Sequence, residues 1–186
     1  MIAVLDTETN WYDELMSVGI VTAEEDGSRF TPHDTIYRII SPAYTAGGMF
    51  SSSLILTGEC DGIIAERDDA MYDIRHFLSA EKVSGIYAYN ARFDHRLLPE
   101  LGDYDWYDIL RIAAYRQFNP MITDAYDCFK TGRMKNGYGV EDIYRMLSGE
   151  RSYSETHNAL RDSVDELNIM NMLEHPSSVY RIAMIQ

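Results

Sequence analysis

The chain has 186 residues, with 16 basic and 30 acidic side chains and a formal net charge of −14. This length is typical of one domain with a single core, so we expect a single domain over residues 1–186. The acidic balance argues against a broad basic face of the kind that holds nucleic-acid phosphates, although metal ions could supply positive charge in a small site.

Targeting signals and cysteines indicate the compartment. No apolar run approaches the roughly 20 residues of a membrane-spanning helix, and we see no signal peptide at the N-terminus. The two cysteines, Cys60 and Cys128, fit neither a disulfide framework nor a C-x-x-C metal site. We therefore expect a reducing, cytoplasmic setting and no membrane partner.

The first forty residues are typical of strands joined by short turns. An apolar run at the N-terminus predicts a buried strand, and Asp26-Gly27 predicts a hairpin turn. We expect a three-stranded antiparallel meander, with the first strand within or beside it. The predicted strands cover residues 2–5, 16–23, and 28–30 together with 35–40.

The rest of the chain alternates helical and extended patterns. Residues 41–64 predict a loop with a short helical piece, and periodicity is lost over residues 116–138. Helices are expected at residues 65–78, at 91–101 after the N-cap Asn90, at 140–147 before Gly149, and at 158–174 before Pro176. Short strands are expected at residues 85–89 and at the start of residues 104–114. This order predicts an α/β fold with a sheet flanked by helices.

Asp6 and Glu8 stand at the end of the first predicted strand. Side chains two residues apart in extended backbone point the same way, so both carboxylates leave one face. Adjacent carboxylates repel each other and are costly near a core unless a cation such as Mg²⁺ neutralises them. Taken alone, the pair is more often a solvated strand end.

Two later stretches carry similar chemistry. Asp94 follows Asn90 by one helical turn. His157 and Asp162 are five positions apart, about 140° of helical rotation, so they would not share a helix face. We therefore expect His157 in the loop before the last helix, where its imidazole can reach a water near the carboxylates, and Asp162 on the first or second turn.

Each of these residues also has an ordinary structural explanation. The helix dipole would favour Asp94 in a first turn, and Asp162 could belong to a solvated acidic face. Asp108 is equally well explained as a support for the site or as a strand-end residue. Lys130, Arg133 and Lys135 form a basic loop. Such a loop is more often an ordinary solvent-exposed loop than a contact for nucleic acid. If the protein does contact a nucleic-acid strand outside the site, this loop is the preferred place.

Together, these motifs resemble the DnaQ-like 3′–5′ exonucleases of the DEDDh type, over nearly the whole chain. The family has a D-x-E, then an N-x-x-F-D, then an H-x-x-x-x-D, which match Asp6 and Glu8, residues 90–94 and residues 157–162. Asn158 stands where the tyrosine variant of the superfamily has Tyr, so the histidine type is favoured. The resemblance implies a ribonuclease-H-like fold, with an antiparallel three-stranded start followed by parallel strands.

The resemblance also implies an activity and its site. The enzyme would be a hydrolase that cleaves phosphodiester bonds from the 3′ end of single-stranded DNA or RNA and releases nucleoside 5′-monophosphates. Asp6, Glu8, Asp94 and Asp162 would hold two Mg²⁺ or Mn²⁺ ions roughly 3.5–4 Å apart. His157 would act as the general base toward the attacking water.

The terminal nucleotide is expected to lie near a further set of residues. The family resemblance implies Thr7, Thr9, Leu56, Thr57, Asn90 and Phe93. Trp11 and Tyr12 join them because aromatic faces just beyond the D-x-E could stack on a base. Asn10 and Trp11 also stand where the family often has Gly, so we expect a reshaped base pocket.

Two alternatives stay open. One is an oligoribonuclease or RNA-trimming exoribonuclease; the other is a non-catalytic nucleic-acid-binding or polymerase-associated module. The presence of every acidic ligand and of the histidine favours an enzyme, and the short tail after Pro176 favours a stand-alone one. The expected partners are single-stranded nucleic-acid 3′ ends. No polymerase partner is indicated, and a homodimer is left open.

Overall fold

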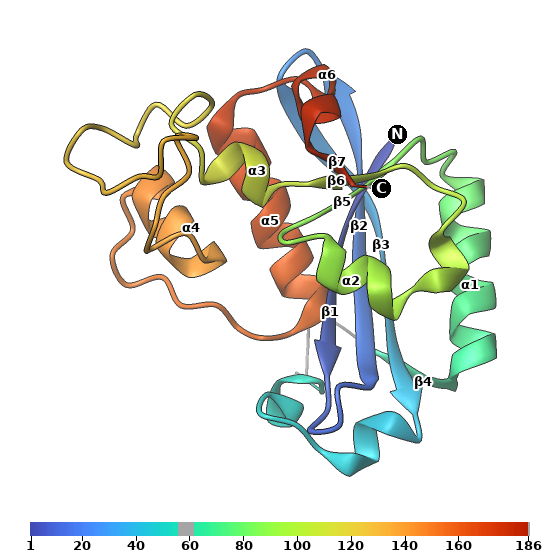
Figure 1. Cartoon of the computed structure of the whole chain (residues 1–186). Coiled ribbons are helices and arrows are strands. Elements are labelled where there is room, and N and C mark those ends of the chain that lie inside the picture. Colours follow the sequence, from blue (N-terminus) through green and yellow to red (C-terminus); the bar gives the residue numbers. More distant parts are fainter. Residues whose placement is uncertain (56–61, 186) are drawn as a thin grey trace.

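A mixed sheet runs through the computed structural model, which describes residues 1–55 and 62–185. In the described residues it has seven strands in the order β4-β3-β2-β1-β5-β6-β7 (Figure 1). The strands are β1 (Ile2–Thr9), β2 (Leu15–Asp26), β3 (Arg29–Ser41), β4 (Ile63–Glu66), β5 (Ile86–Ala88), β6 (Trp106–Asp108) and β7 (Met184–Ile185). The pairs β1–β2, β2–β3 and β6–β7 are antiparallel, whereas β3–β4, β1–β5 and β5–β6 are parallel.

Helices cover both faces of this sheet (Figure 1). They are α1 (Arg67–Ala80), α2 (Arg92–Leu97), α3 (Leu110–Ala113), α4 (Val140–Ser148), α5 (Ala159–Leu173) and α6 (Ser177–Tyr180). Single 3₁₀ turns lie at Ala43–Ala46, Ser51–Ser53, Pro99–Leu101 and Arg181–Ala183. Within the described ranges, none of the helices combines the length and apolarity needed to cross a bilayer.

The alternation of side chains along β1 divides the core in two. Ile2 and Val4 pack in one cluster with residues of α5, whereas Ala3 and Leu5 pack in another with residues of α1. Because strand side chains alternate between faces, Asp6 and Glu8 continue the α5 side and Thr7 continues the opposite side. The strand therefore delivers two carboxylates to the face on which α5 lies.

Several elements agree with the sequence-based expectations. The antiparallel meander is confirmed, and α4 ends at Gly149, which has a left-handed φ of 76°. Helix α5 begins after Asn158, whose side chain accepts a hydrogen bond from the Arg161 N–H as an N-cap does. Strands β4 and β7 were not expected, because both are short and each depends on a distant partner strand.

The expected role of Asn90 as a helix cap is wrong. Its φ is +61°, and α2 begins only at Arg92, after Ala91 and with no side-chain cap. The helix is also shorter than expected. It ends at Leu97, because Pro99 has no N–H to continue the hydrogen-bonding pattern, and a 3₁₀ turn follows.

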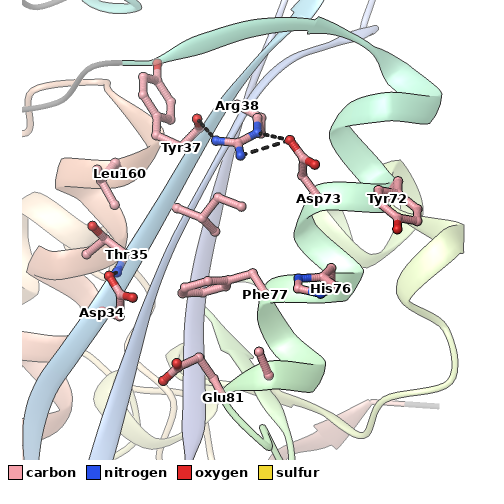
Figure 2. A pocket seen from close by; sticks show the side chains of 12 residues that line it. Asp34, Thr35, Tyr37, Arg38, Tyr72, Asp73, His76, Phe77, Glu81 and Leu160 are labelled. Atoms are coloured by element: carbon pink, nitrogen blue, oxygen red, sulfur yellow. Dashed lines mark hydrogen bonds and ion pairs between the residues drawn. The ribbon is translucent and has the colours of Figure 1, made fainter.

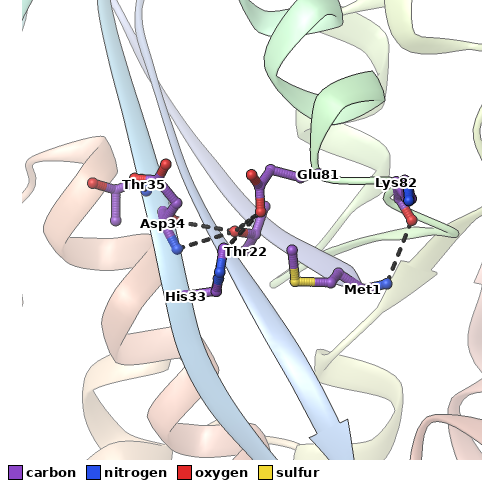
Figure 3. A network of polar contacts seen from close by, with 7 residues as sticks. All are labelled: Met1, Thr22, His33, Asp34, Thr35, Glu81 and Lys82. Atoms are coloured by element: carbon purple, nitrogen blue, oxygen red, sulfur yellow. Dashed lines mark hydrogen bonds and ion pairs between the residues drawn. The ribbon is translucent and has the colours of Figure 1, made fainter.

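A polar network fixes β2 and β3 against the end of α1 (Figure 3). The β2–β3 register shifts between Val21 and Ala23, which leaves a bulge opposite Thr22. The buried Thr22 hydroxyl donates to the Asp34 carbonyl and accepts from the Asp34 N–H, both at 3.2 Å. His33 Nδ1 lies 2.8 Å from Glu81 Oε2, which joins the bulge to the helix.

A cavity of about 590 Å³ lies between β3 and α1 (Figure 2). Arg38 and Asp73 form an ion pair across it, with the guanidinium 2.9 Å from Asp73 Oδ2. Among the described residues, none of those predicted to be catalytic, metal-binding or nucleotide-binding lines this cavity. It is therefore separate from the site that the sequence predicts.

The approach of α5 to the sheet depends on Gly19. This glycine is the β2 partner of Asp6, and a Cβ there would collide with the backbone of Ala159 and Leu160 at the start of α5. Only a residue without a side chain lets the helix pass this close to the strands. The same helix carries Asp162 on its first turn.

We expect Gly19→Ala to destabilise the fold by about 1–3 kcal/mol or more, because backbone cannot yield to the added methyl as a flexible side chain would. Chemical denaturation measures this change. Gly139→Ala is the matched control, since a Cβ at Gly139 meets open space. Equal unfolding free energies for the two variants would contradict the close approach.

Candidate active site

Four segments meet where β1 ends. Asp6 and Glu8 come from β1, Asp94 from α2, His157 from the loop before α5, and Asp162 from the first turn of α5 (Figure 1). His157 lies outside the helix as expected, with a left-handed φ of 55°.

Glu8, His157 and Asp162 form the tightest part of the site. Each offers one ligand atom, and these three atoms all lie within 4.8 Å of one another. Asp162 is 1% exposed, and its Oδ1 has no hydrogen-bond partner among the described residues. A buried carboxylate oxygen without a donor is costly, and the carboxylate oxygens of Glu8 and Asp162 are ligands of the kind that a hard divalent cation takes.

Asp94 reaches the site along the open edge of β1. The strand pairs with β5 only as far as Val4, so α2 can approach the residues beyond. The Thr7 hydroxyl donates to Asp94 Oδ1 at 2.7 Å, and Asp94 is 2% exposed. Thr7, expected near the nucleotide, thus has its hydroxyl engaged in holding Asp94.

The site concentrates like charges. Burial is the largest cause that raises the pKa of Glu8 and of Asp94 to about 7 and that of Asp162 to about 8. Burial also raises the pKa of Asp6 well above its ordinary value, and its neighbouring carboxylates, Glu166 first, add to that effect. Such groups hold protons up to a higher pH than ordinary carboxyl groups do, and a bound cation would favour their ionised forms.

Two acidic residues of the site were missed by the sequence analysis. Glu166 is 2% exposed and lies four residues after Asp162, on the same face of α5, and its Oε2 accepts the Tyr89 N–H at 3.0 Å. The spacing from Asp162 was a usable signal. Glu155 lies in the loop before His157, its charge acts on both Glu8 and Asp162, and burial raises its pKa to about 7. No sequence pattern marked it.

Asp108 supports the site indirectly, through backbone segments that lead to it. It is buried, and its Oδ1 accepts the N–H groups of Asn90 at 3.0 Å and of Leu110 at 3.1 Å. It therefore holds both the turn that leads to α2 and the start of α3. Of the two explanations left open for Asp108, support of the site agrees with these contacts.

The imidazole of His157 is held by an aromatic ring that the sequence analysis did not select. Phe50 stacks on it with ring centroids 3.5 Å apart and an interplanar angle of 15°. Burial lowers the pKa of His157, and the charge of Glu141 opposes this in part. The neutral imidazole, which is the form that accepts a proton, is thereby favoured at neutral pH.

A slot of about 450 Å³ adjoins the carboxylates. It is lined by Thr7, Glu8, Thr9, Asn10, Trp11, Asp13, Met49, Phe50 and Phe93. Trp11 is 64% exposed and forms part of the wall, whereas Tyr12 is 75% exposed and lies outside the lining. Asn90 is exposed and also lies outside the lining. The predicted contacts Leu56 and Thr57 fall outside the described residues.

Asn10 shapes the wall that carries Trp11. It is buried, and its Oδ1 accepts the N–H groups of Tyr12 at 2.9 Å and of Glu14 at 3.0 Å. Its amide donates to Glu14 Oε2 at 2.8 Å. An asparagine therefore closes a tight turn here, which explains how Trp11 is presented to the slot.

Neither the comparison with protein-family models nor that with curated proteins finds a match. Among solved structures, the chain is similar to a 3′-exonuclease, in a structure of 3′-end specific recognition of histone mRNA stem-loop by 3′-exonuclease, with a TM-score of 0.63 and 13% sequence identity. The match covers 93% of this chain and 63% of that chain, so this chain spans less than two thirds of the solved one. The expected α/β fold, a ribonuclease-H-like mixed sheet flanked by helices, is confirmed, and it is the fold of a 3′-exonuclease.

The crowded carboxylates predict how the stability of the metal-free protein depends on pH. Glu8, Asp94 and Asp162 have folded-state pKa values of about 7 to 8, above the ordinary value of about 4. Between these values the folded state binds more protons than the unfolded state, so the free energy of unfolding decreases as pH rises.

We therefore expect Tm in EDTA to be lower at about pH 8.5 than at about pH 5.5, and Mn²⁺ to restore much of the loss by binding the folded state. Differential scanning calorimetry measures both effects. Asp162→Asn should flatten the pH dependence, because it removes one of the repelling charges. A Tm in EDTA that rises over this interval would contradict the charge crowding.

Proposed function

We propose that this chain is a metal-dependent 3′–5′ exonuclease of the DEDDh type. It hydrolyses phosphodiester bonds at the 3′ ends of single-stranded DNA or RNA and releases nucleoside 5′-monophosphates, as a single domain over residues 1–186. The observation that carries the proposal is the convergence of Glu8, His157 and Asp162 within 4.8 Å beside an aromatic slot. The likeness in fold to a 3′-exonuclease supports it.

In this proposal, Asp6, Glu8, Asp94 and Asp162 hold two Mg²⁺ or Mn²⁺ ions. The unpartnered Oδ1 of Asp162 and the burial-raised pKa values of these carboxyl groups support a cation at this place. When bound, such ions lower the pKa of a coordinated water and stabilise negative charge on the phosphate and the leaving oxygen.

His157 takes the proton of the attacking water. The lowered pKa of its imidazole supports this role, and so does the position of a ring nitrogen within 4.8 Å of carboxylate oxygens of Glu8 and Asp162. The Phe50 ring stacks on the imidazole and fixes its plane, so His157 is held in one orientation. After the bond breaks, the half-buried His157 passes its proton to solvent, and the leaving 3′-oxygen takes a proton from solvent.

The slot holds the terminal nucleotide. Trp11, Phe50 and Phe93 offer aromatic faces for the base, which every nucleobase can use because each has a π face. None of the described residues that line the slot is basic, so recognition there rests on stacking and on polar contacts with Thr9 and the backbone. This suits a chain whose overall charge repels phosphates.

An RNA-trimming exoribonuclease is the second candidate. The similar solved structure concerns a histone mRNA stem-loop, which favours RNA as the substrate. The two candidates share the same site and differ only in the strand that enters it, so one assay with both strands separates them.

The proposal predicts metal-dependent shortening of 5′-labelled oligonucleotides from their 3′ ends. We expect a ladder with Mg²⁺ or Mn²⁺ and none with EDTA, on DNA, on RNA or on both. His157→Ala should reduce turnover by about 10²–10⁴-fold while metal binding persists, and Asp6→Ala should lose both. His76→Ala, on the exposed face of α1, is the control that should behave as wild type. If well-folded protein yields no product on either DNA or RNA, the proposal is wrong.

Base stacking in the slot predicts a difference between two adjacent aromatic residues. Trp11→Ala should lower kcat/KM by about 5–150-fold, because a base–aromatic stack contributes roughly 1–3 kcal/mol. Tyr12→Ala, which changes an equally exposed ring outside the slot, should leave kcat/KM within about twofold of wild type. Steady-state kinetics on a short single strand measure both. Equal losses for the two variants would argue against the slot.

A further inference from the structure

Two buried carboxylates receive two consecutive backbone N–H groups just beyond β5. Glu166 Oε2 accepts the Tyr89 N–H, and Asp108 Oδ1 accepts the Asn90 N–H, each at 3.0 Å. They come from different elements, since Glu166 lies on α5 and Asp108 ends β6. The β1–β5 ladder has already ended at Tyr87, so these amides depend on side-chain acceptors.

The peptide units held in this way lead directly into α2. Asn90 adopts a left-handed φ of +61°, and its carbonyl accepts the Phe93 N–H at 2.9 Å to form the turn that precedes the helix. Asp94 follows one residue later. The direction in which Asp94 points is therefore set by the orientation of the Tyr89 and Asn90 peptides.

Glu166 also shares a helix face with Asp162, four residues before it. One face of α5 thus presents Asp162 to the site. One turn later, the same face holds, through Glu166, the chain that leads into α2 and Asp94. We propose that Glu166 is a positioning residue that sets the separation of Asp94 and Asp162 through its hydrogen bond with the Tyr89 N–H. This inference rests on the proposed function, in which both aspartates hold metal.

Glu166 is 2% exposed and lies among the other carboxyl groups. Burial, and after it repulsion from Asp94, raises the pKa of Glu166 well above its ordinary value, and the hydrogen bond from the Tyr89 N–H opposes this shift. The Tyr89 N–H therefore stabilises the ionised form that the surroundings disfavour, while Glu166 holds the Tyr89 peptide in place.

The test compares variants that separate the acceptor from the charge. Glu166→Gln keeps an oxygen for the Tyr89 N–H and removes the charge, whereas Glu166→Ala removes both. Glu166→Met fills the volume without an acceptor and replaces Glu166→Ala if that variant does not fold. Glu174→Gln, at the exposed end of the same helix, controls for loss of one negative charge.

Two readouts do not require activity. Hydrogen exchange by NMR reports on the Tyr89 amide, and calorimetric titration with Mn²⁺ alone reports on the metal site. For the variant without an acceptor we expect both the exchange rate and the Mn²⁺ Kd to rise by roughly tenfold or more, and for Glu166→Gln and Glu174→Gln to stay within about threefold of wild type.

Two outcomes would overturn the inference. If Glu166→Gln binds Mn²⁺ as weakly as the variant without an acceptor, Glu166 acts through its charge and not by positioning. If removal of the acceptor leaves the Mn²⁺ affinity unchanged, Glu166 has no role at the site. A wild-type protein that binds Mn²⁺ but cleaves neither DNA nor RNA would refute the proposed function and leave this test intact.

Discussion

Repulsion between buried carboxylates is the constraint on which this structure depends. Three elements that are distant in sequence, β1, α2 and α5, bring acidic side chains together at the end of β1, where burial raises their pKa values. Apolar clusters on both faces of the sheet hold these elements in place and offset the electrostatic cost. A protein without a use for cations would gain stability by replacing such a group with apolar side chains.

The same constraint explains several local features that are otherwise unrelated. Gly19 lets the start of α5 rest against the strand beside Asp6. The hydroxyl of Thr7 donates to Asp94 and holds it at the open edge of β1. Each feature restricts an acidic side chain of the site that would otherwise turn toward solvent. The carboxyl groups therefore stay together in the metal-free protein. The site is preorganised by contacts that are mostly neutral.

The sequence predicted the parts of this site that depend on local periodicity. Strand alternation placed Asp6 and Glu8 together, and helical geometry placed His157 in a loop before Asp162. The structure brings Glu8, His157 and Asp162 within reach of one another. Tertiary contacts decided the rest: Phe50 meets His157 across more than a hundred residues, and Glu166, which the sequence analysis did not select, is buried. The left-handed Asn90 was likewise fixed by a distant acceptor, Asp108.

The ion pair between Asp13 and Arg96 joins the turn behind Trp11 to α2, with nitrogen–oxygen distances of 2.8 and 3.2 Å. Arg96 follows Asp94 by two residues on that short helix. A ligand that orders the Trp11 turn therefore also orders the helix that carries Asp94. By thermodynamic linkage, the occupants of slot and carboxylate cluster would raise each other's affinity by the same factor. Under the proposed function, the protein would hold cations less firmly when a strand end fits the slot poorly, and such a strand would be cleaved more slowly.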